Sequence, residues 1–239
     1  MSRLYLVRHG QASFFEDDYD KLSPLGERQS EVLGKYWAAN AVRIDKVYCG
    51  TLRRQVQTVE RIGATYAAGG CDWPAVETLP GLDEYPSEDI MGTLLPELCA
   101  SGGRFQAMHE ANQNAKERSD KYRAYHRLLE AVMEVWVSGI YESSGIPTWS
   151  EFSGGVRGAL RVIMDNAASG QTIAVSTSGG PIGVSVQTAL AAPAIKAAEL
   201  NWRIHNCSLT EFSFTKGRFT LDRFNSTAHL TDSEMLTYR

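Results

Sequence analysis

The sequence predicts an α/β protein, a three-layer α/β/α sandwich with a mostly parallel sheet. Short apolar runs that indicate buried strands alternate along the chain with longer segments whose apolar residues recur every three or four positions. Several of these runs end in a turn that leads directly into a helix, which is typical of parallel sheets. The length of 239 residues, 43% of them hydrophobic, suits a single domain over 1–239 that carries an insertion.

The first predicted strand, Leu4 to Val7, runs into the tripeptide Arg8-His9-Gly10. Ser23-Pro24 then predicts the start of a helix, because Ser is a favourable N-cap and Pro fits the first helical position. The apolar face of this helix is expected to contain Leu25, Val32, Leu33, Tyr36 and Trp37.

The next unit repeats the same order of strand and helix. Val47-Tyr48-Cys49 predicts a short strand, and the helix after it is expected to end at Gly69-Gly70. Ala75 to Leu79 predicts a third strand. The apolar face of the second helix is formed by Leu52, Val56, Val59, Ile62 and Tyr66.

A helical insertion is predicted over about 85–148. Pro86, Pro96 and Ser101-Gly102-Gly103 are expected to separate its helices. A long amphipathic stripe from Tyr122 to Trp136 predicts the largest of them. The sequence leaves open whether this layer covers a binding site or packs only for stability.

The core pattern then resumes. Thr148-x-x-Glu151 is a capping box that predicts a new helix. Thr172 to Ser176 predicts a strand, and a helix is expected to begin near Pro181. Leu209 to Phe214 and Phe219 to Phe224 predict a closing hairpin with Lys216-Gly217 at its turn.

The composition excludes several classes of function. A net charge of −4 lacks the basic excess typical of nucleic-acid binding, so no nucleic acid is expected as a partner. The chain has no apolar run long enough for a membrane span and no signal-peptide core, which predicts a cytoplasmic protein without membrane contact. The four cysteines are scattered without a CxxC motif, so neither disulfides nor a zinc site is expected. A homodimer remains compatible with the sequence.

The first strand ends in residue types suited to phosphate chemistry. The carboxyl ends of strands are where open α/β sheets bind ligands. Arg8 offers a planar fork for phosphate oxygens, and His9 can attack phosphorus and carry the phosphoryl group. Gly10 lets the backbone approach an anion closely. A strand end with a surface arginine and a hydrogen-bonded histidine is the simpler alternative.

Further junctions of the same kind follow. Arg53-Arg54 lies in the first turn of a predicted helix, where arginine is unfavourable unless an anion lies nearby. The turn Thr177-Ser178-Gly179-Gly180-Pro181 combines hydroxyl groups and free amides at another helix start. Glu84 follows the third strand and is a candidate general acid, with Asp83 as its competitor. Taken singly, each has a simpler explanation. Arg53-Arg54 can be a solvated basic pair, the Thr177-Ser178 turn an ordinary N-cap, and Glu84 a surface acid.

Taken in order, these segments resemble the histidine phosphatase superfamily, also called phosphoglycerate mutase-like, and in particular its bacterial phosphatase-type members. The matching segments are Leu6-Val7-Arg8-His9-Gly10-Gln11, Leu22-Ser23-Pro24-Leu25-Gly26, Leu52-x-Arg54-x-x-Gln57-Thr58, Leu82-x-Glu84 and Asn225-Ser226-Thr227-Ala228-His229-Leu230. The resemblance implies a phosphoglycerate mutase-like fold and a phosphomonoester hydrolase that forms a phosphohistidine at His9. It implies Glu84 as the acid and base, and phosphate binding by Arg8, Gly10, Gln11, Arg54, Ser178 and Gly179. It implies a small phosphorylated substrate, with no cofactor and no metal.

The chain departs from the family pattern at Ser178. The family usually has a second histidine there, within Ser-His-Gly-Gly, and losing one such preorganised donor costs on the order of a hundredfold in rate. His205 or His229 is a candidate spatial substitute. This departure keeps open a second hypothesis, a phospho-ligand binding module with little catalysis.

A phosphoglycerate mutase-type transfer is the other alternative. Family mutases typically carry Glu-Ser and a Thr-Gly-Trp segment after Arg-His-Gly. This chain has Gln11-Ala12-Ser13 and then an acidic loop, which favours hydrolysis. The acidic residues of that loop are Glu16, Asp17, Asp18 and Asp20.

Overall fold

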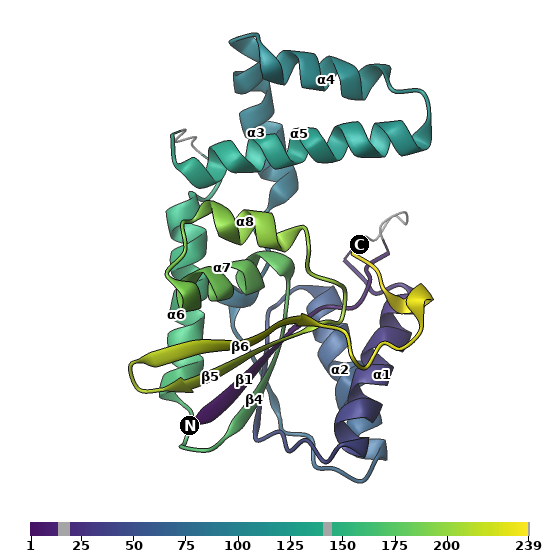
Figure 1. Ribbon diagram of the computed structural model, residues 1–239, viewed down its shortest axis with the longest axis vertical. Helices are drawn as coiled ribbons and strands as arrows, with labels where there is room; N and C mark the ends of the chain where they lie inside the picture. Colours follow the sequence, from purple (N-terminus) through teal and green to yellow (C-terminus); the bar gives the residue numbers. More distant parts are fainter. Residues whose placement is uncertain (14–19, 141–144, 239) are drawn as a thin grey trace. The chain divides into compact units, whose positions relative to one another are not determined.

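The computed structural model describes residues 1–13, 20–140 and 145–238 (Figure 1). The chain forms two compact units, of which the first joins Met1–Glu84 to Gly154–Arg239 and the second is Tyr85–Ser153. Glu16, Asp17 and Asp18 of the acidic loop lie outside the described residues, and Asp20 lies inside them. A single domain with an insertion over about 85–148 stays a prediction.

The first unit contains a six-stranded sheet in the order β3-β2-β4-β1-β5-β6. Its strands are β1 (Ser2–Arg8), β2 (Lys46–Cys49), β3 (Val76–Thr78), β4 (Thr172–Thr177), β5 (Leu209–Thr215) and β6 (Arg218–Ser226). The pairs β1–β4, β2–β4 and β2–β3 are parallel, whereas β5 pairs antiparallel with both β1 and β6. The predicted hairpin is therefore an antiparallel edge on a parallel sheet, and Gly217 provides its turn with φ +90°.

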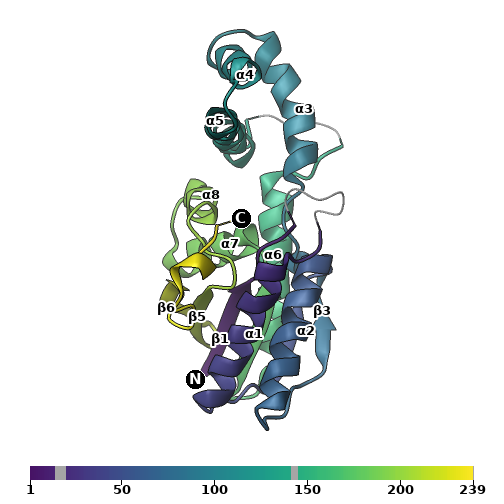
Figure 2. The ribbon, with the colours of Figure 1, turned by 90° about the vertical axis from the view of Figure 1, so that its right-hand side faces the viewer.

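Helices cover both faces of this sheet, which confirms the predicted α/β/α class (Figure 1). The helices of the unit are α1 (Pro24–Ala39), α2 (Arg53–Ala68), most of α6 (Trp149–Asp165), α7 (Gly179–Leu190) and α8 (Ile195–Asn201), with short 3₁₀ turns at Pro80–Leu82 and Ser233–Met235. Figure 2 shows α1 and α2 side by side on one face, and α6 and α7 lie on the other. Helix α8 was not predicted from the sequence.

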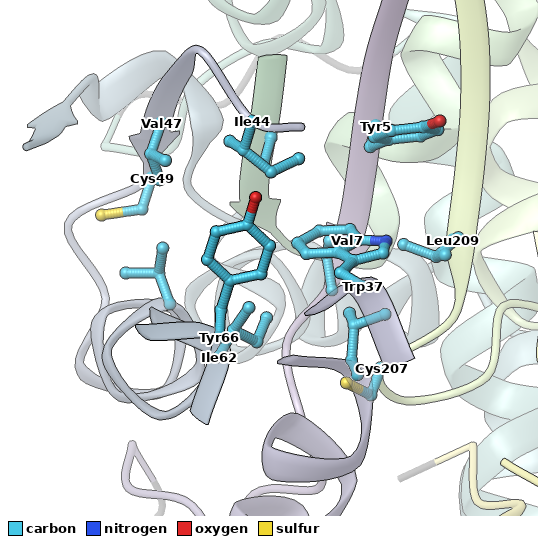
Figure 3. Packing of buried hydrophobic residues seen from close by; sticks show 13 residues of the cluster. Tyr5, Val7, Trp37, Ile44, Val47, Cys49, Ile62, Tyr66, Cys207 and Leu209 are labelled. Carbon is cyan, nitrogen blue, oxygen red and sulfur yellow. The ribbon is translucent and has the colours of Figure 1, made fainter. Parts of the chain in front are cut away.

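The core between the sheet and α1 and α2 explains why these helices lie where they do. Val7 and Val47 point toward Trp37 and Tyr66, and all four side chains are almost completely buried (Figure 3). The rings of Tyr5 and Trp37 lie 5.9 Å apart. Burying an apolar side chain of this size contributes on the order of 2–3 kcal/mol. These contacts therefore fix α1 and α2 against the sheet, with their first turns near the carboxyl ends of β1 and β2.

The predicted helix signals are present as hydrogen bonds. The Ser23 hydroxyl accepts from the Gly26 N–H at 3.1 Å, which caps α1. The Thr148 N–H donates to Glu151 at 2.7 Å, and the Glu151 N–H donates back to Thr148 Oγ1 at 3.1 Å, which completes the capping box of α6. Helix α7 begins at Gly179, slightly before Pro181, because proline is tolerated in a first turn where its missing N–H is not needed.

The second unit is helical and comprises α3 (Ser87–Ala100), α4 (Arg104–Asn114), α5 (Arg118–Ser138) and the start of α6. The rings of Tyr85 and Trp149 pack against Trp136 at 5.2 and 5.3 Å. The apolar stripe of α5 is buried from Leu128 onward, but Tyr122 at its start is 48% exposed. Every helix in the described ranges is too short or too polar to cross a membrane.

One predicted helix boundary in this unit is wrong. Pro96 was expected to separate two helices, but it lies inside α3. Its ring removes the N–H that would bond the carbonyl of Gly92, four residues earlier. Both residues are on the exposed side of the helix, so water can satisfy that carbonyl. The helix therefore continues through the proline.

Candidate active site

The candidate residues meet where parallel strands end at the same edge of the sheet. Helix α1 leads away from β1 on one face, and α7 leads away from the adjacent β4 on the other. Such a point, where neighbouring connections diverge, leaves a crevice that α/β proteins use for ligands. The His9 N–H donates to the Thr177 carbonyl at 2.8 Å, which ties the two strand ends together. The predicted junctions after β1 and β4 are therefore neighbours.

His9 is buried with its ring held in one orientation. Its Nδ1 lies 2.7 Å from the Gly10 carbonyl, which can only accept, so Nδ1 carries the proton. Nε2 then keeps its lone pair, and it lies 3.3 Å from Nε of Arg54. Burial, followed by the charges of Arg54 and Arg8, lowers the pKa of His9 well below its ordinary value of 6.5. The imidazole is thus neutral at neutral pH, as a nucleophile requires.

Arg54 is the member of the arginine pair that enters the site. It is 7% exposed, whereas Arg53 is exposed. One end of its guanidinium faces His9, and Nη1 pairs with Asp20 Oδ1 at 2.5 Å. Its carbonyl accepts from the Thr58 hydroxyl at 2.8 Å, and Thr58 Oγ1 in turn accepts from the Gly10 N–H at 2.9 Å. Thr58 therefore joins α2 to the loop after β1.

Arg8 also borders the nucleophile. Its guanidinium donates to the Ile204 carbonyl. Its own carbonyl accepts from the Cys207 N–H at 2.9 Å, which fixes the end of β1 against the segment before β5. The charge of Arg8 contributes to the low pKa of His9, so it acts on the ring electrostatically.

The loop after β1 is supported by polar residues that the sequence analysis missed. Gln29 is fully buried; its Oε1 accepts from the Gln11 N–H at 2.8 Å, and its Nε2 donates to the Met235 carbonyl at 2.7 Å. Asn206, also fully buried, donates to the His9 carbonyl at 3.2 Å. The Gln11 side chain itself accepts from the Ser23 hydroxyl at 2.8 Å. The loop thus rests on α1 and the C-terminal segment.

Glycine at position 10 is required by close packing. A Cβ there would lie 2.4 Å from the carbonyl oxygen of Gly26 in the first turn of α1. Gly26 is restricted in the same way, because a Cβ on it would lie 2.1 Å from the Gln11 carbonyl oxygen. The loop that follows His9 can therefore lie directly on the start of α1 only with these two glycines.

Ser178 lies at the end of β4, where it is fully buried. Gln55 donates from Nε2 to Ser178 Oγ at 2.8 Å and to the Leu82 carbonyl at 3.0 Å. The serine hydroxyl proton is then directed elsewhere, since this bond uses the oxygen as an acceptor. At Gly179, a Cβ would lie 1.8 Å from Oδ1 of Asn201, so a larger residue there would require the Asn201 side chain to move.

The structure separates the two candidate acids. The Gly180 N–H donates to both carboxylate oxygens of Glu84, at 3.1 and 3.2 Å, which places Glu84 at the first turn of α7. Asp83 instead accepts from the N–H and the hydroxyl of Thr51, both at 2.5 Å, at the turn after β2. Glu84 is therefore the acid beside the Ser178 turn.

The two other candidate histidines make different contacts. The backbone N–H of His205 donates to Asn225 Oδ1 at 2.8 Å, and the centroid of its tilted ring lies 4.1 Å from that of Tyr238. His229 is buried, with Nε2 2.9 Å from the Cys207 carbonyl. Within the described part of the chain, His229 Nδ1 has no hydrogen-bond partner. Both rings are thus engaged with the C-terminal part of the first unit.

We expect His229 to make stability sensitive to acid. Burial lowers its pKa to about 4, against 6.5 in an unfolded chain, so the unfolded state binds the proton first as pH falls. The free energy of unfolding should therefore decrease between pH 6.5 and pH 4, by on the order of 3 kcal/mol from this residue. Urea unfolding of the wild type and of His229→Gln at pH 7 and pH 4 measures this difference.

His9, whose pKa is also lowered by burial, contributes to the same acid sensitivity, so the His229→Gln variant should keep part of the pH dependence. A His205→Gln variant, which leaves His229 in place, is the control and should still lose stability as pH falls toward 4. Equal losses in the wild type and His229→Gln would contradict the assignment to His229.

No group of three or more His, Cys, Asp or Glu side chains in the described ranges is arranged to hold a metal ion.

Comparisons with known proteins show the family and the fold of this chain. A family model for the histidine phosphatase superfamily (branch 1) matches residues 4–227. A comparison with curated proteins finds no match.

Several solved structures share the fold. A phosphoserine phosphatase from Entamoeba histolytica, in complex with 3-phosphoglyceric acid, is 21% identical with a TM-score of 0.62, over 96% of this chain and 100% of that one. A mycobacterial glucosyl-3-phosphoglycerate phosphatase with inorganic phosphate is 18% identical with a TM-score of 0.63, over 95% of this chain and 98% of that one. A phosphoglycerate mutase from Bacillus anthracis is 13% identical with a TM-score of 0.62, over 96% of this chain and 95% of that one.

Proposed function

We propose, since this chain belongs to the histidine phosphatase superfamily (branch 1), that it hydrolyses phosphate monoesters through a phosphohistidine at His9. The observation that carries the proposal is the state of that ring. His9 is buried, its pKa is lowered, and Nε2 keeps its lone pair opposite the Arg54 guanidinium. A neutral imidazole beside a fixed cation is suited to attack a phosphoryl group that the cation holds.

In the first step, His9 Nε2 attacks phosphorus and forms an N–P bond while the ester P–O bond breaks. The Glu84 carboxyl gives its proton to the leaving oxygen, so an alcohol departs and Glu84 becomes a carboxylate. The position of Glu84 at the first turn of α7 supports this role, since that turn follows directly on the strand beside β1.

In the second step, water attacks the phosphohistidine. Glu84 accepts a proton from that water, the N–P bond breaks, and inorganic phosphate leaves with His9 neutral again. Glu84 thereby recovers the proton that the next cycle needs.

Charge on the transferring phosphoryl group is balanced by this chain's own residues. Arg54 and Arg8 supply two cations beside His9, and both are close enough to lower its pKa. Amides at the starts of α2 and α7 add partial positive charge. We propose on these grounds that hydrolysis needs no metal and that the substrate is a small phosphorylated molecule. The Entamoeba and mycobacterial structures, with phosphoglycerate and phosphate, support that substrate class.

Ser178 is expected to contribute a phosphate contact in place of the missing imidazole. Its oxygen accepts from Gln55, which leaves its proton to donate to a phosphoryl oxygen. Removing one such donor in Ser178→Ala should lower kcat by about 10²-fold. Steady-state kinetics with an aryl phosphate measures the change. Ser185→Ala is the control, since that buried hydroxyl bonds the Pro181 carbonyl within α7, and the same loss in both variants would contradict the prediction.

The direct test is to capture the intermediate. The enzyme is mixed with an aryl phosphate labelled in its phosphoryl group, quenched in alkali and digested, because an N–P bond is labile in acid. The label is expected on the peptide that contains His9, and chelation should not prevent its formation. A label on another residue would overturn the mechanism. Return of the label to an organic product rather than to inorganic phosphate would favour mutase-type transfer.

A further inference from the structure

Asp20 makes two contacts that no catalytic assignment explains. Its Oδ1 pairs with Nη1 of Arg54 at 2.5 Å, and its Oδ2 accepts from the backbone N–H of Arg53 at 2.8 Å. One carboxylate therefore bridges the first turn of α2 and the side chain that projects from it. The Asp20 side chain is 36% exposed and the Arg54 side chain 9%.

The backbone contact places Asp20 at the start of α2. The residue before that helix is Leu52, whose side chain has no oxygen to cap it. A carboxylate from a distant segment takes this position and also opposes the positive end of the helix dipole. Asp20 is thereby anchored to the backbone, so its other oxygen presents a fixed acceptor to Arg54.

The side-chain contact fixes the direction of the guanidinium. Nη1 is bound to Asp20, while Nε faces His9 Nε2 at 3.3 Å. These are different nitrogens of one rigid plane, so holding the first orients the second. Asp20 therefore does not occupy the side of Arg54 that faces the nucleophile.

We infer that Asp20 is a positioning residue for the proposed reaction: it holds Arg54 so that its Nε–H points to the place where the phosphoryl group meets His9. The inference rests on the proposed function. Asp20 does not touch the reacting atoms, and it acts through Arg54.

The test compares Asp20→Asn with a matched ion pair on the same helix. Asp20→Asn keeps the shape but removes the charge that orients Arg54. Glu27→Gln removes the carboxylate that pairs with Arg61 of α2 at 2.8 Å and is the control. Asp20→Asn is expected to lower kcat by about 10–100-fold. KM should change little, because the Arg54 charge stays in the site. Glu27→Gln should leave both values unchanged.

A double-mutant cycle shows whether Asp20 acts through Arg54. In an Arg54→Lys background, Asp20→Asn should change kcat by less than about twofold, because the group it positions is already altered. Asp20→Glu, which keeps the charge, should recover most of the turnover. An equal loss in both backgrounds, or no recovery with glutamate, would overturn the inference. So would a higher affinity for inorganic phosphate with wild-type kcat in Asp20→Asn, since Asp20 would then be a competitor of the substrate.

A second readout does not depend on activity. The Nε–H resonance of Arg54 in ¹⁵N spectra should be sharp and slow to exchange in the wild type and in Glu27→Gln, and broadened or fast to exchange in Asp20→Asn. If the wild type shows no His9-dependent turnover, the proposed function fails, and this resonance still decides the role of Asp20. An unchanged resonance in Asp20→Asn would show that Asp20 does not order the guanidinium.

Discussion

Replacing His9 with alanine is expected to reduce the turnover of an aryl phosphate by on the order of 10⁴-fold or more. The reason is chemical: without Nε2 no N–P bond can form, and direct attack by water has no general base at that position. The measurement is the release of the aryl alcohol under saturating substrate, with equal unfolding temperatures showing that both proteins are folded.

Binding of inorganic phosphate should survive in His9→Ala, because the cations Arg54 and Arg8 remain in the site. His205→Gln is the matched control and should turn over substrate at the wild-type rate, since its contacts are with Asn225 and Tyr238. A wild type that binds phosphate but does not turn over substrate would instead identify a binding module. Turnover that persists in His9→Ala would place the nucleophile elsewhere.

The parts of the site that follow from local sequence were predictable. His9 comes directly after a run of apolar residues, and the end of a parallel strand is where such a sheet binds ligands. Ser23-Pro24 and the Thr148–Glu151 box are helix starts whose hydrogen bonds form between residues at most three positions apart. Because such hydrogen bonds join near neighbours in the chain, they can be predicted from the local sequence alone.

The choice between Asp83 and Glu84 was not predictable. The two acids are adjacent in the sequence, and the resemblance alone favoured Glu84. What separates their side chains is the position of two distant segments, Thr51 after β2 and Gly180 in α7. The partner of a polar side chain in a loop depends on tertiary structure, which no local pattern encodes.

The buried polar residues that hold the loop after β1 gave no signal either. Gln29 lies on a helix that shows an ordinary amphipathic pattern, and Asn206 lies in a segment without a recognised motif. Each is fully buried, and its amide can both donate and accept, so it satisfies backbone groups from segments far apart in the sequence. A glutamine on the inner face of a helix would have been the one available clue.

Arg54→Met is expected to lower kcat/KM by about 10²–10³-fold and to shift the pH profile. Methionine keeps a similar volume without the charge, so the phosphoryl group loses a cation. Arg54 also disfavours the protonated imidazole and lowers the pKa of His9, second only to burial. Removing it raises that pKa, and His9 must be neutral to attack. As pH falls, kcat/KM should therefore begin to decrease at a higher pH in the variant than in the wild type.

The matched control is the neighbouring residue. Arg53 carries the same charge in the same helical turn, but it is exposed, so its charge is screened by solvent. Arg53→Met should keep kcat/KM and the wild-type pH profile. The shifted acid limb in Arg54→Met should still lie below pH 6.5, because burial and Arg8 continue to lower the pKa of His9. Equal losses in both variants, or an unshifted profile in Arg54→Met, would contradict the assignment of Arg54 as the cation that faces the nucleophile.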